Sequence, residues 1–451
     1  MPRLLRMLLL VVCILSGSLA HAEPLRIGTF AVDASPPVGS PLAYDPTAGV
    51  QLPLSCRGIV ITGAGEPIVL CAVDWIGISN GGNRVFRERL AKAAGTTAER
   101  VAVHTLHQHD APRCDFSAED LLREYGLEGA GFNPAHARDV IHRAGLAVAD
   151  AIEQARPVTH IGLGEGTVEK VASNRRILGP DGKVQYTRYT ATANPKIRAF
   201  PAGTIDPKLK LISFWNGETP LVAVTWYATH PQSYYRTGLA NPDFPGMARN
   251  ARQNETGVMH VHFNGAGGNI GAGKWNDGSP SNRQVLADRV AAGMKAAWEN
   301  TRRVPVTAED VAWAVQPVVL PVADHLDEAE LLAIVEDSDA DNATRYYAAK
   351  NLSWLRRCVA GDTIDIGCLT LGPARVLHMP GELFVEYQLA AQQVRPDLFV
   401  AMAAYGDYAP GYIGTEVAYG QGGYETSARA SRVSPAVEKT LMDAVRSLLK
   451  D

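Results

Sequence analysis

Apolar runs with the period of a β-strand alternate along this chain with segments that have the period of an amphipathic helix. We expect strands at residues 58–62, 67–74, 100–103, 209–215, 221–227, 369–371, 375–378 and 398–404. We expect helices at residues 83–94, 133–155, 282–299 and 437–449, one or two helices over 327–357, and one helix that ends at residue 393.

This alternation predicts an α/β fold in several layers, with a mixed and largely buried β-sheet flanked by helices. Residues 23–451 contain no internal repeat, no low-complexity tract and no long linker, which predicts a single domain. Polar residues follow several of the strands directly. Open α/β sheets usually place their sites at the carboxyl ends of strands, so we expect the functional site there.

The first 22 residues have the pattern of a secretory signal peptide. Arg3 and Arg6 precede an apolar run, and Ala20, His21 and Ala22 form a cleavage pattern, which predicts a secreted or periplasmic protein. An uncleaved N-terminal anchor is the alternative, although the run is short for a bilayer, and no later run predicts a stable membrane anchor. The net charge of -4 is small and mixed in sign, which argues against nucleic acid as a partner.

Five cysteines follow the signal sequence, and none of them has the spacing of a zinc finger. An odd number excludes complete pairing within the chain. Cys358 and Cys368 flank a turn-like stretch and could close a hairpin with a disulfide bond in an oxidising compartment. Any metal ion would therefore be held mainly by histidine, carboxylate or tyrosine side chains.

Residues 103–112 place three histidines within six positions, directly after a predicted strand. Side chains two positions apart on a strand share a face, so we expect His107 and His109 to point the same way and His104 to point the other way. Neutral imidazole is a common ligand for zinc and other transition metals. A metal-assisted hydrolase is therefore the first hypothesis.

Three further segments contain residues that suit chemistry. His230 precedes Pro231 at the end of an apolar strand, where it is either a metal ligand or a hydrogen-bonded structural residue. Glu382 lies at a strand-to-helix corner, where a carboxylate either binds a metal or stabilises the helix start. Residues 406–425 are rich in Gly and Tyr and could line a site. The glycine-rich residues 264–271 lack the full dinucleotide-binding spacing.

Taken in order, these segments resemble the catalytic domain of the neutral/alkaline, non-lysosomal ceramidase family. The A-T-H-T-H-S-G-P-like segment of the family is similar to residues 106–112, its W-x-A-x-H element matches 226–230, and its P-G-E element matches 380–382. Its C-terminal signature, Y-x-x-T-x-E-E-Y-x-x-x-x-Y-E, is similar to residues 412–425. The four motifs keep the family's order across nearly the whole chain after residue 22.

The resemblance implies one zinc ion with four protein ligands, which are His107, His230, Glu382 and Tyr412. It also implies a catalytic role beside the metal for three further residues, which are His109, Arg175 and Tyr424.

The chain departs from the family pattern in three places. Gly271 stands where the family has a serine that has been proposed as a nucleophile, so a serine mechanism cannot run from that position. The larger ceramidases carry a C-terminal sandwich domain, which we expect to be missing here. Of the S-G-D-N element near the second histidine only Asp243 remains. Asp243 and Asp110 either orient an imidazole or serve as turn residues.

The expected activity is hydrolysis of an amide bond in a ceramide-like or other N-acyl substrate by metal-activated water. His109 would move a proton to the leaving group, and Arg175 or Tyr424 would stabilise the oxyanion. The expected partner is a small molecule or lipid with an N-acyl group. Two alternatives are a metal-dependent hydrolase of a non-lipid amide, ester or sugar derivative, and a non-catalytic periplasmic ligand-binding protein.

Overall fold

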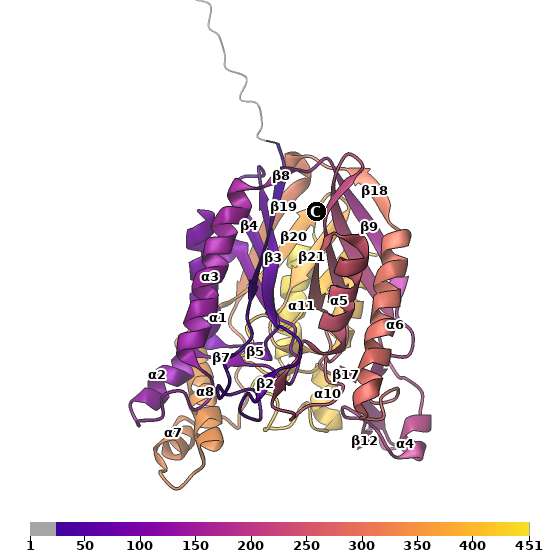
Figure 1. Ribbon diagram of the computed structural model, residues 1–451. Coiled ribbons are helices and arrows are strands. Elements are labelled where there is room, and N and C mark those ends of the chain that lie inside the picture. Colours follow the sequence, from indigo (N-terminus) through magenta and orange to yellow (C-terminus); the bar gives the residue numbers. More distant parts are fainter. Residues whose placement is uncertain (1–23, 451) are drawn as a thin grey trace, which may run out of the picture.

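A computed structural model describes residues 24–450 of the chain. The predicted signal peptide and its cleavage site lie outside the described residues. The strands form three larger sheets, with long helices along the outside of the molecule (Figure 1). Among the described residues, no helix combines the length and the apolar composition that crossing a bilayer requires.

The first sheet has the strand order β6-β4-β3-β1-β8, the second β16-β14-β13-β9-β18 and the third β19-β20-β21-β23. The strands of the first sheet are β1 (Arg26–Asp33), β3 (Ser55–Thr62), β4 (Ile68–Val73), β6 (Val101–Thr105) and β8 (Arg156–Pro157). Those of the second sheet are β9 (His160–Thr167), β13 (Lys208–Asn216), β14 (Thr219–Tyr227), β16 (Met259–Asn264) and β18 (Arg302–Pro305). Those of the third sheet are β19 (Val311–Val318), β20 (Ile364–Leu371), β21 (Ala374–His378) and β23 (Phe399–Ala403).

Each of these sheets contains one parallel pair among antiparallel neighbours. The parallel pairs are β4 with β6, β14 with β16, and β21 with β23. The prediction of an α/β fold with mixed, buried strands is therefore confirmed, and the strands are distributed over three sheets.

The inner faces of the three sheets share one hydrophobic cluster, to which Ile59 of β3, Phe214 of β13 and Val376 of β21 all belong. Successive side chains of a strand point to opposite faces. In β3, Ile59 and Ile61 therefore enter this shared cluster, whereas Val60 enters another cluster together with residues of α1 and α3. Burial on both faces explains why the strands read as continuous apolar runs.

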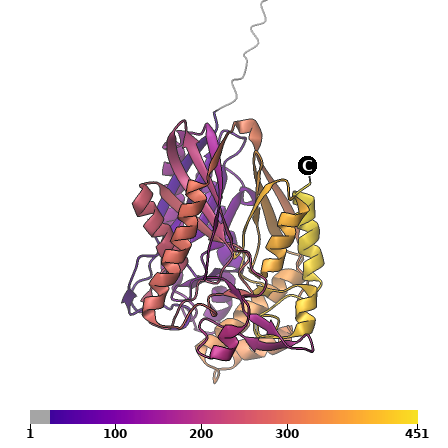
Figure 2. The ribbon, with the colours of Figure 1, turned by 90° about the vertical axis from the view of Figure 1, so that its right-hand side faces the viewer.

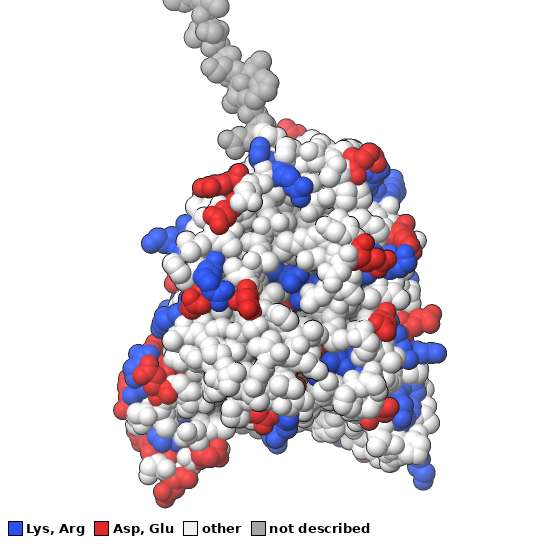
Figure 3. Space-filling view, in the orientation of Figure 1, with Lys and Arg blue, Asp and Glu red and all other residues white. Residues whose placement is uncertain are grey.

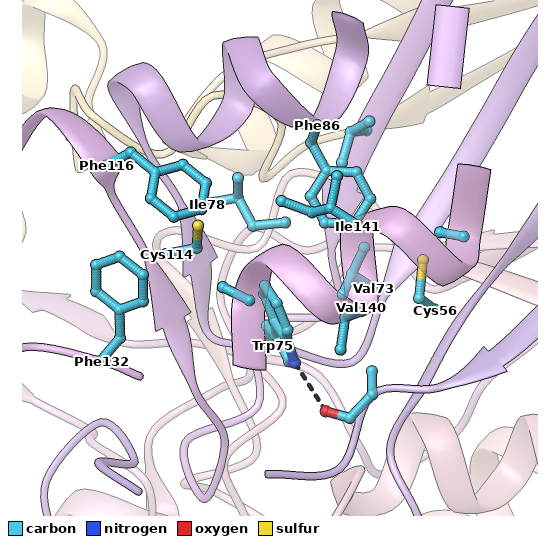
Figure 4. Close-up of a cluster of buried hydrophobic side chains, with 14 of the residues drawn as sticks. Cys56, Val73, Trp75, Ile78, Phe86, Cys114, Phe116, Phe132, Val140 and Ile141 are labelled. Atoms are coloured by element: carbon cyan, nitrogen blue, oxygen red, sulfur yellow. Dashed lines mark hydrogen bonds between the residues drawn. The ribbon is translucent and has the colours of Figure 1, made fainter. Parts of the chain in front are cut away.

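Helices cover the outer faces of the sheets, and Figure 2 shows α11, in yellow, along one side of the molecule. The covering helices are α1 (Asn80–Ala94) and α3 (Pro134–Glu153) on the first sheet, α5 (Asp243–Thr256) and α6 (Pro280–Glu299) on the second, and α9 (Val385–Val394) and α11 (Val437–Leu448) on the third. Figure 4 shows the packing under α1 and α3, where the Trp75 indole N–H donates to the Ala34 carbonyl (3.0 Å).

Shorter elements gather at the end of the sheets that is lower in Figure 1. The two-stranded pairs are β2 (Gly49–Val50) with β15 (Leu239–Ala240), β5 (Gly77–Ile78) with β7 (Arg113–Cys114), β10 (Ser173–Asn174) with β17 (Ile270–Gly271), β11 (Arg176–Leu178) with β12 (Val184–Thr187), and β22 (Glu382–Leu383) with β24 (Tyr412–Ile413). The remaining helices are α2 (Phe116–Arg123), α4 (Pro195–Ala199), α7 (Glu328–Glu336), α8 (Asn342–Val359) and α10 (Glu416–Gln421).

Cys358 and Cys368, which could have formed a disulfide bond across a hairpin, are both free and buried. Residues 359–363 do not connect two strands of a hairpin. Cys358 lies in the last turn of α8, and Cys368 lies in the middle of β20. The two thiols therefore lie in the same hydrophobic cluster but on different elements, a helix and a strand.

A buried ion pair connects the first sheet to a helix of the second. Asp74 follows β4 and accepts two hydrogen bonds from Arg249 of α5, at 2.7 and 2.9 Å, and both side chains are fully buried. Burial alone would raise the pKa of Asp74, but the Arg249 guanidinium outweighs burial and holds this pKa below the ordinary value of 3.8.

We expect Asp74→Ala to lower the free energy of unfolding by about 3–5 kcal/mol, because the change leaves the Arg249 charge buried without a partner. Urea unfolding at neutral pH measures the loss. The depressed pKa adds stability that is present in full above pH 3.8 and disappears as the pH falls through the lower folded-state value. Glu218→Ala, which removes a largely exposed partner of Arg303, is the control and should change little. Equal effects of the two changes would contradict this assignment.

Candidate metal centre

Three of the predicted ligands follow the carboxyl ends of strands from three different sheets. His107 follows β6, His230 follows β14, and Glu382 follows β21. Their side chains converge: the ring centroids of His107 and His230 lie 4.8 Å apart, and His107 Nε2 lies 3.3 Å from Glu382 Oε2. All three side chains are buried. The strand-end site that we expected from the sequence is therefore assembled where the three sheets meet.

The proximity of His107 and His109 does not arise from a shared strand face, as the sequence suggested. Strand β6 ends at Thr105, and His107 has a left-handed backbone conformation with a φ of 64°. Such a conformation is uncommon for residues other than glycine and often marks a functional segment. The turn brings the two rings to a centroid distance of 5.2 Å with an edge-on arrangement.

The hydrogen bonds of His107 leave one ring nitrogen for a cation. Its Nδ1 donates to the Ile76 carbonyl at 2.6 Å, so Nε2 is the nitrogen that faces Glu382. Two lone pairs would face each other across 3.3 Å unless a proton or a metal ion lies between them. Glu382 Oε2 and His230 Nδ1 have no hydrogen-bond partner in the described structure. Buried polar atoms without partners are expected where a metal ion binds.

His109 lies beside this group and is held by two polar side chains. The Gln232 amide donates to His109 Nδ1 at 2.9 Å, and the Tyr44 hydroxyl lies 3.0 Å from the same nitrogen. The ring proton of neutral His109 is therefore on Nε2, and this nitrogen lies 3.0 Å from His230 Nε2. The ligand atoms of His107, His109 and His230 all lie within 4.8 Å of one another, so these three residues could hold a metal ion.

Electrostatics keep the cluster in the state that metal binding requires. Burial, followed by the nearby His107 and Arg175, lowers the pKa values of His109 and His230 well below their ordinary range, so both rings are neutral at pH 7. Burial would raise the pKa of Glu382, but His107 and the hydroxyls of Tyr408 and Tyr412 outweigh it, and the carboxylate stays ionised. Neutral imidazoles beside one carboxylate form a typical donor set for zinc.

Tyr412 is placed against Glu382 by the backbone. The two residues are paired in the short parallel ladder of β22 and β24, and the Tyr412 ring lies parallel to that of His230 at a centroid distance of 6.4 Å. Burial raises the pKa of Tyr412 well above its usual range, while Arg175 acts in the opposite direction. Tyr412 is therefore a neutral phenol unless a further cation joins it.

Arg175 and Tyr424 border the same group next to Tyr412. Arg175 donates to the Tyr412 hydroxyl at 3.0 Å and forms an ion pair with Glu425 at 3.2 Å. The Tyr424 ring lies 5.7 Å from that of Tyr412 and 5.9 Å from the Arg175 guanidinium. The structure thus brings all seven residues of the predicted site together: His107, His109, Arg175, His230, Glu382, Tyr412 and Tyr424.

A scan of protein-family models found no match to the chain, and neither did a search of curated protein sequences. Two solved structures are similar. A ceramidase in complex with C2 has a TM-score of 0.68 at 17% identity, over 94% of this chain and 75% of its own. Neutral ceramidase from Pseudomonas aeruginosa has a TM-score of 0.65 at 18% identity, over 94% of this chain and 74% of its own. The chain has the ceramidase fold. At this identity the likeness concerns the fold alone.

Gly271, where the resemblance led us to compare the chain with a serine, borders the candidate centre. Gly271 lies in β17 opposite Ser173, and a Cβ atom placed there would lie 3.5 Å from the Arg175 side chain. That distance is an ordinary contact, so the space of a side chain is still present although the hydroxyl is missing. The chain has no serine nucleophile at this position.

Of the two roles considered for Asp110 and Asp243, the structure supports that of turn residues. Asp110 accepts hydrogen bonds from the Arg236 and Thr237 backbone, and Asp243 accepts from the backbone N–H of Ser233. Neither carboxylate contacts an imidazole within residues 24–450, so both serve to fix turns. His104 also lies outside the centre: it donates to the Ala404 carbonyl at 2.7 Å, as expected for a structural histidine.

Sequence reasoning missed several residues that support the centre. The Tyr408 hydroxyl donates to Glu382, and the Tyr405 ring stacks on His107 at 4.6 Å. Both belong to the glycine- and tyrosine-rich loop or precede it directly, so the loop composition was the available signal. Nothing in the local sequence singles out Tyr44, which reaches His109 from a distant loop.

Proposed function

We propose that this protein is a metal-dependent hydrolase that cleaves an amide bond in an N-acyl substrate. One observation carries the proposal: His107 Nε2 and Glu382 Oε2 face each other across 3.3 Å, with His230 and His109 beside them, at the strand ends of a ceramidase-like fold. The reaction consumes one water molecule, breaks the C–N bond, and releases a carboxylic acid and an amine.

We assign His107, His230, Glu382 and Tyr412 as ligands of a zinc ion. Nitrogen and oxygen donors of this kind suit zinc, and the unpartnered atoms of Glu382 and His230 support the choice. When zinc is bound in such a site, it lowers the pKa of a bound water molecule to about 7 and polarises a carbonyl group. Residues of the chain supply the remaining chemistry.

His109 and Arg175 have complementary roles in this proposal. His109 carries a proton on Nε2 at the edge of the cluster, where it can pass that proton to the leaving amine. Arg175 and the Tyr424 hydroxyl are hydrogen-bond donors next to Tyr412, where they can stabilise negative charge on the carbonyl oxygen. The ion pair with Glu425 and the bond to Tyr412 hold the Arg175 guanidinium in place.

Removing the metal should abolish hydrolysis, and adding zinc should restore it. We expect chelator-treated protein to lose turnover of fluorogenic N-acyl substrates by at least about a thousandfold, since the activated water is lost. Stoichiometric zinc should recover the activity, whereas magnesium should not, because it prefers an octahedral oxygen environment. N-acylsphingosine, short N-acyl amino acids and a matched ester are the substrates to compare. Full activity of metal-free protein would refute the proposal.

We also propose that the protein acts outside the cytoplasm, because residues 1–22 have the pattern of a signal peptide. The intact mass of the protein exported by its host should match a chain that begins at Glu23. Retention of residues 1–22 would contradict export by cleavage.

A further inference from the structure

The cavity beside the metal centre contains an excess of positive charge. It has a volume of about 440 Å³ and extends from His107 and His109 to α8 and the segment after Tyr424. Its basic lining residues are Arg113, Lys350, Arg429 and Arg432, and its acidic lining residue is the ligand Glu382. The outer surface contrasts with this, because Figure 3 shows both charges interspersed over the face it displays.

Three of these cations are buried or half-buried, and none of them forms a direct ion pair within residues 24–450. Lys350 is only 5% exposed, and its ammonium group lies 4.4 Å from the centre of the Tyr408 ring without a hydrogen bond. Arg432 donates to Asn351 and to the Ala430 carbonyl. Arg113 donates to a backbone carbonyl and lies over two tyrosine rings at 5.3 Å. All of these contacts are with neutral groups.

Buried charges in folded proteins are normally paired, since an unpaired charge in a low-dielectric interior is costly. In the same chain Arg249 is paired with Asp74 and Arg357 with Asp407, whereas the buried Arg188 is held by backbone carbonyls. Around Lys350, burial and then Arg432 lower the pKa of the ammonium group well below its ordinary value, and Asp115 and Glu382 only partly oppose this effect. An anion would compensate the charge of this cluster.

The cation cluster is one tyrosine ring away from the metal centre. Lys350 lies against the ring of Tyr408, and the hydroxyl of the same ring donates to Glu382. A single small molecule can therefore occupy both places, with its anionic group on the cations and its scissile bond at the metal centre. Because a single tyrosine ring separates the two places, the anionic group and the scissile bond of such a molecule must be close together.

We propose that the substrate of this site carries an oxyanion, a carboxylate or a phosphate, that binds to Lys350, Arg113 and Arg432 while the amide bond lies at the metal centre. This inference rests on the proposed hydrolase function and narrows its substrate class to N-acyl compounds with an anionic head group. A neutral head group such as that of ceramide would offer no anion to these three basic residues.

Matched substrates that differ in charge alone test the proposal. N-lauroylglycine and N-lauroylglycinamide have the same chain and nearly the same size, and N-lauroylethanolamine with its O-phosphate forms a second pair. We expect kcat/KM to favour the anionic member of at least one pair by roughly 10- to 100-fold, the range of a charge-assisted hydrogen bond. The pair with the larger ratio of kcat/KM values, anionic to neutral, shows whether the site prefers a carboxylate or a phosphate.

Variants of the basic residues test whether they cause the preference for the anionic substrate. Lys350→Met should lower kcat/KM for the anionic substrate by roughly 10- to 100-fold and leave the neutral one nearly unchanged. Arg429→Gln, at an exposed position on the cavity rim, should give a smaller loss and does not threaten folding. Lys439→Met removes an exposed charge on α11 and serves as the control. Equal rates for both members of each pair, or a preference for the neutral members, would overturn the proposal.

A binding experiment separates this inference from the hydrolase function. If no substrate is turned over, calorimetric titration of metal-free protein with N-lauroylglycine and N-lauroylglycinamide still gives a result. Tighter binding of the anion that is lost in Lys350→Met would support the anion site while the hydrolase proposal fails. Equal binding or none would overturn the anion site, whatever the catalytic outcome.

Discussion

Replacing His230 with alanine should remove both the bound zinc and the hydrolytic activity. His230 is buried between His107, His109 and the plane of Tyr412, and alanine offers no ligand atom in place of the imidazole. We expect zinc affinity to fall by more than the roughly 10- to 100-fold that the loss of an outer hydrogen-bonding partner costs. Metal analysis after dialysis and the rate of N-acyl hydrolysis measure the two effects.

The control for His230→Ala is His142→Ala, at an exposed position on α3 that faces Arg89. It should bind zinc and turn over substrate as the unaltered protein does. Circular dichroism of both variants shows whether the fold is kept. Unchanged zinc occupancy in a folded His230→Ala protein would show that this histidine is not a ligand.

His109→Gln should have the opposite signature, with zinc retained and turnover lost. The Gln232 and Tyr44 contacts fix the ring of His109, and its Nε2 proton points into the cluster. Removing a positioned proton donor lowers rates by about 100- to 10,000-fold, so we expect kcat to fall within that range. Zinc titration and steady-state kinetics on the same preparation separate the two properties.

The His109 prediction has a clear alternative in the geometry. The ligand atoms of His109, His107 and His230 lie close enough for a site with three histidines, in which Glu382 would be a partner of lesser importance. Loss of zinc from His109→Gln together with retention in Glu382→Gln would establish that arrangement. Retention in the first and loss in the second would establish the ligand set proposed above.

The elements of the fold were largely readable from the sequence, because burial on both faces makes the strands continuous apolar runs. The strands expected at 209–215 and 221–227 are observed as Lys208–Asn216 and Thr219–Tyr227. The division into three sheets was not readable. Apolar periodicity reports that a strand is buried but not which strands pair, and the parallel partners β14 and β16 are separated by a loop and α5.

The site, too, could be predicted from the sequence only in part. The position of His230 and Glu382 after strands could be predicted from apolar runs that end at Tyr227 and His378. The left-handed turn at His107 could not, because the sequence contains no glycine or asparagine there to indicate it. The burial of Lys350 could not be predicted either, because its helix has the pattern of an ordinary amphipathic segment and only the tertiary structure places the ammonium group against the Tyr408 ring.

An anomalous-difference map at the zinc absorption edge, from crystals of the zinc-loaded protein, tests the central claim most directly. The proposed function predicts one strong peak within roughly 2.0–2.2 Å of an imidazole nitrogen of His107, an imidazole nitrogen of His230 and a carboxylate oxygen of Glu382. A zinc-loaded crystal without a peak at these three residues, or with its ordered zinc elsewhere in the molecule, would contradict the account.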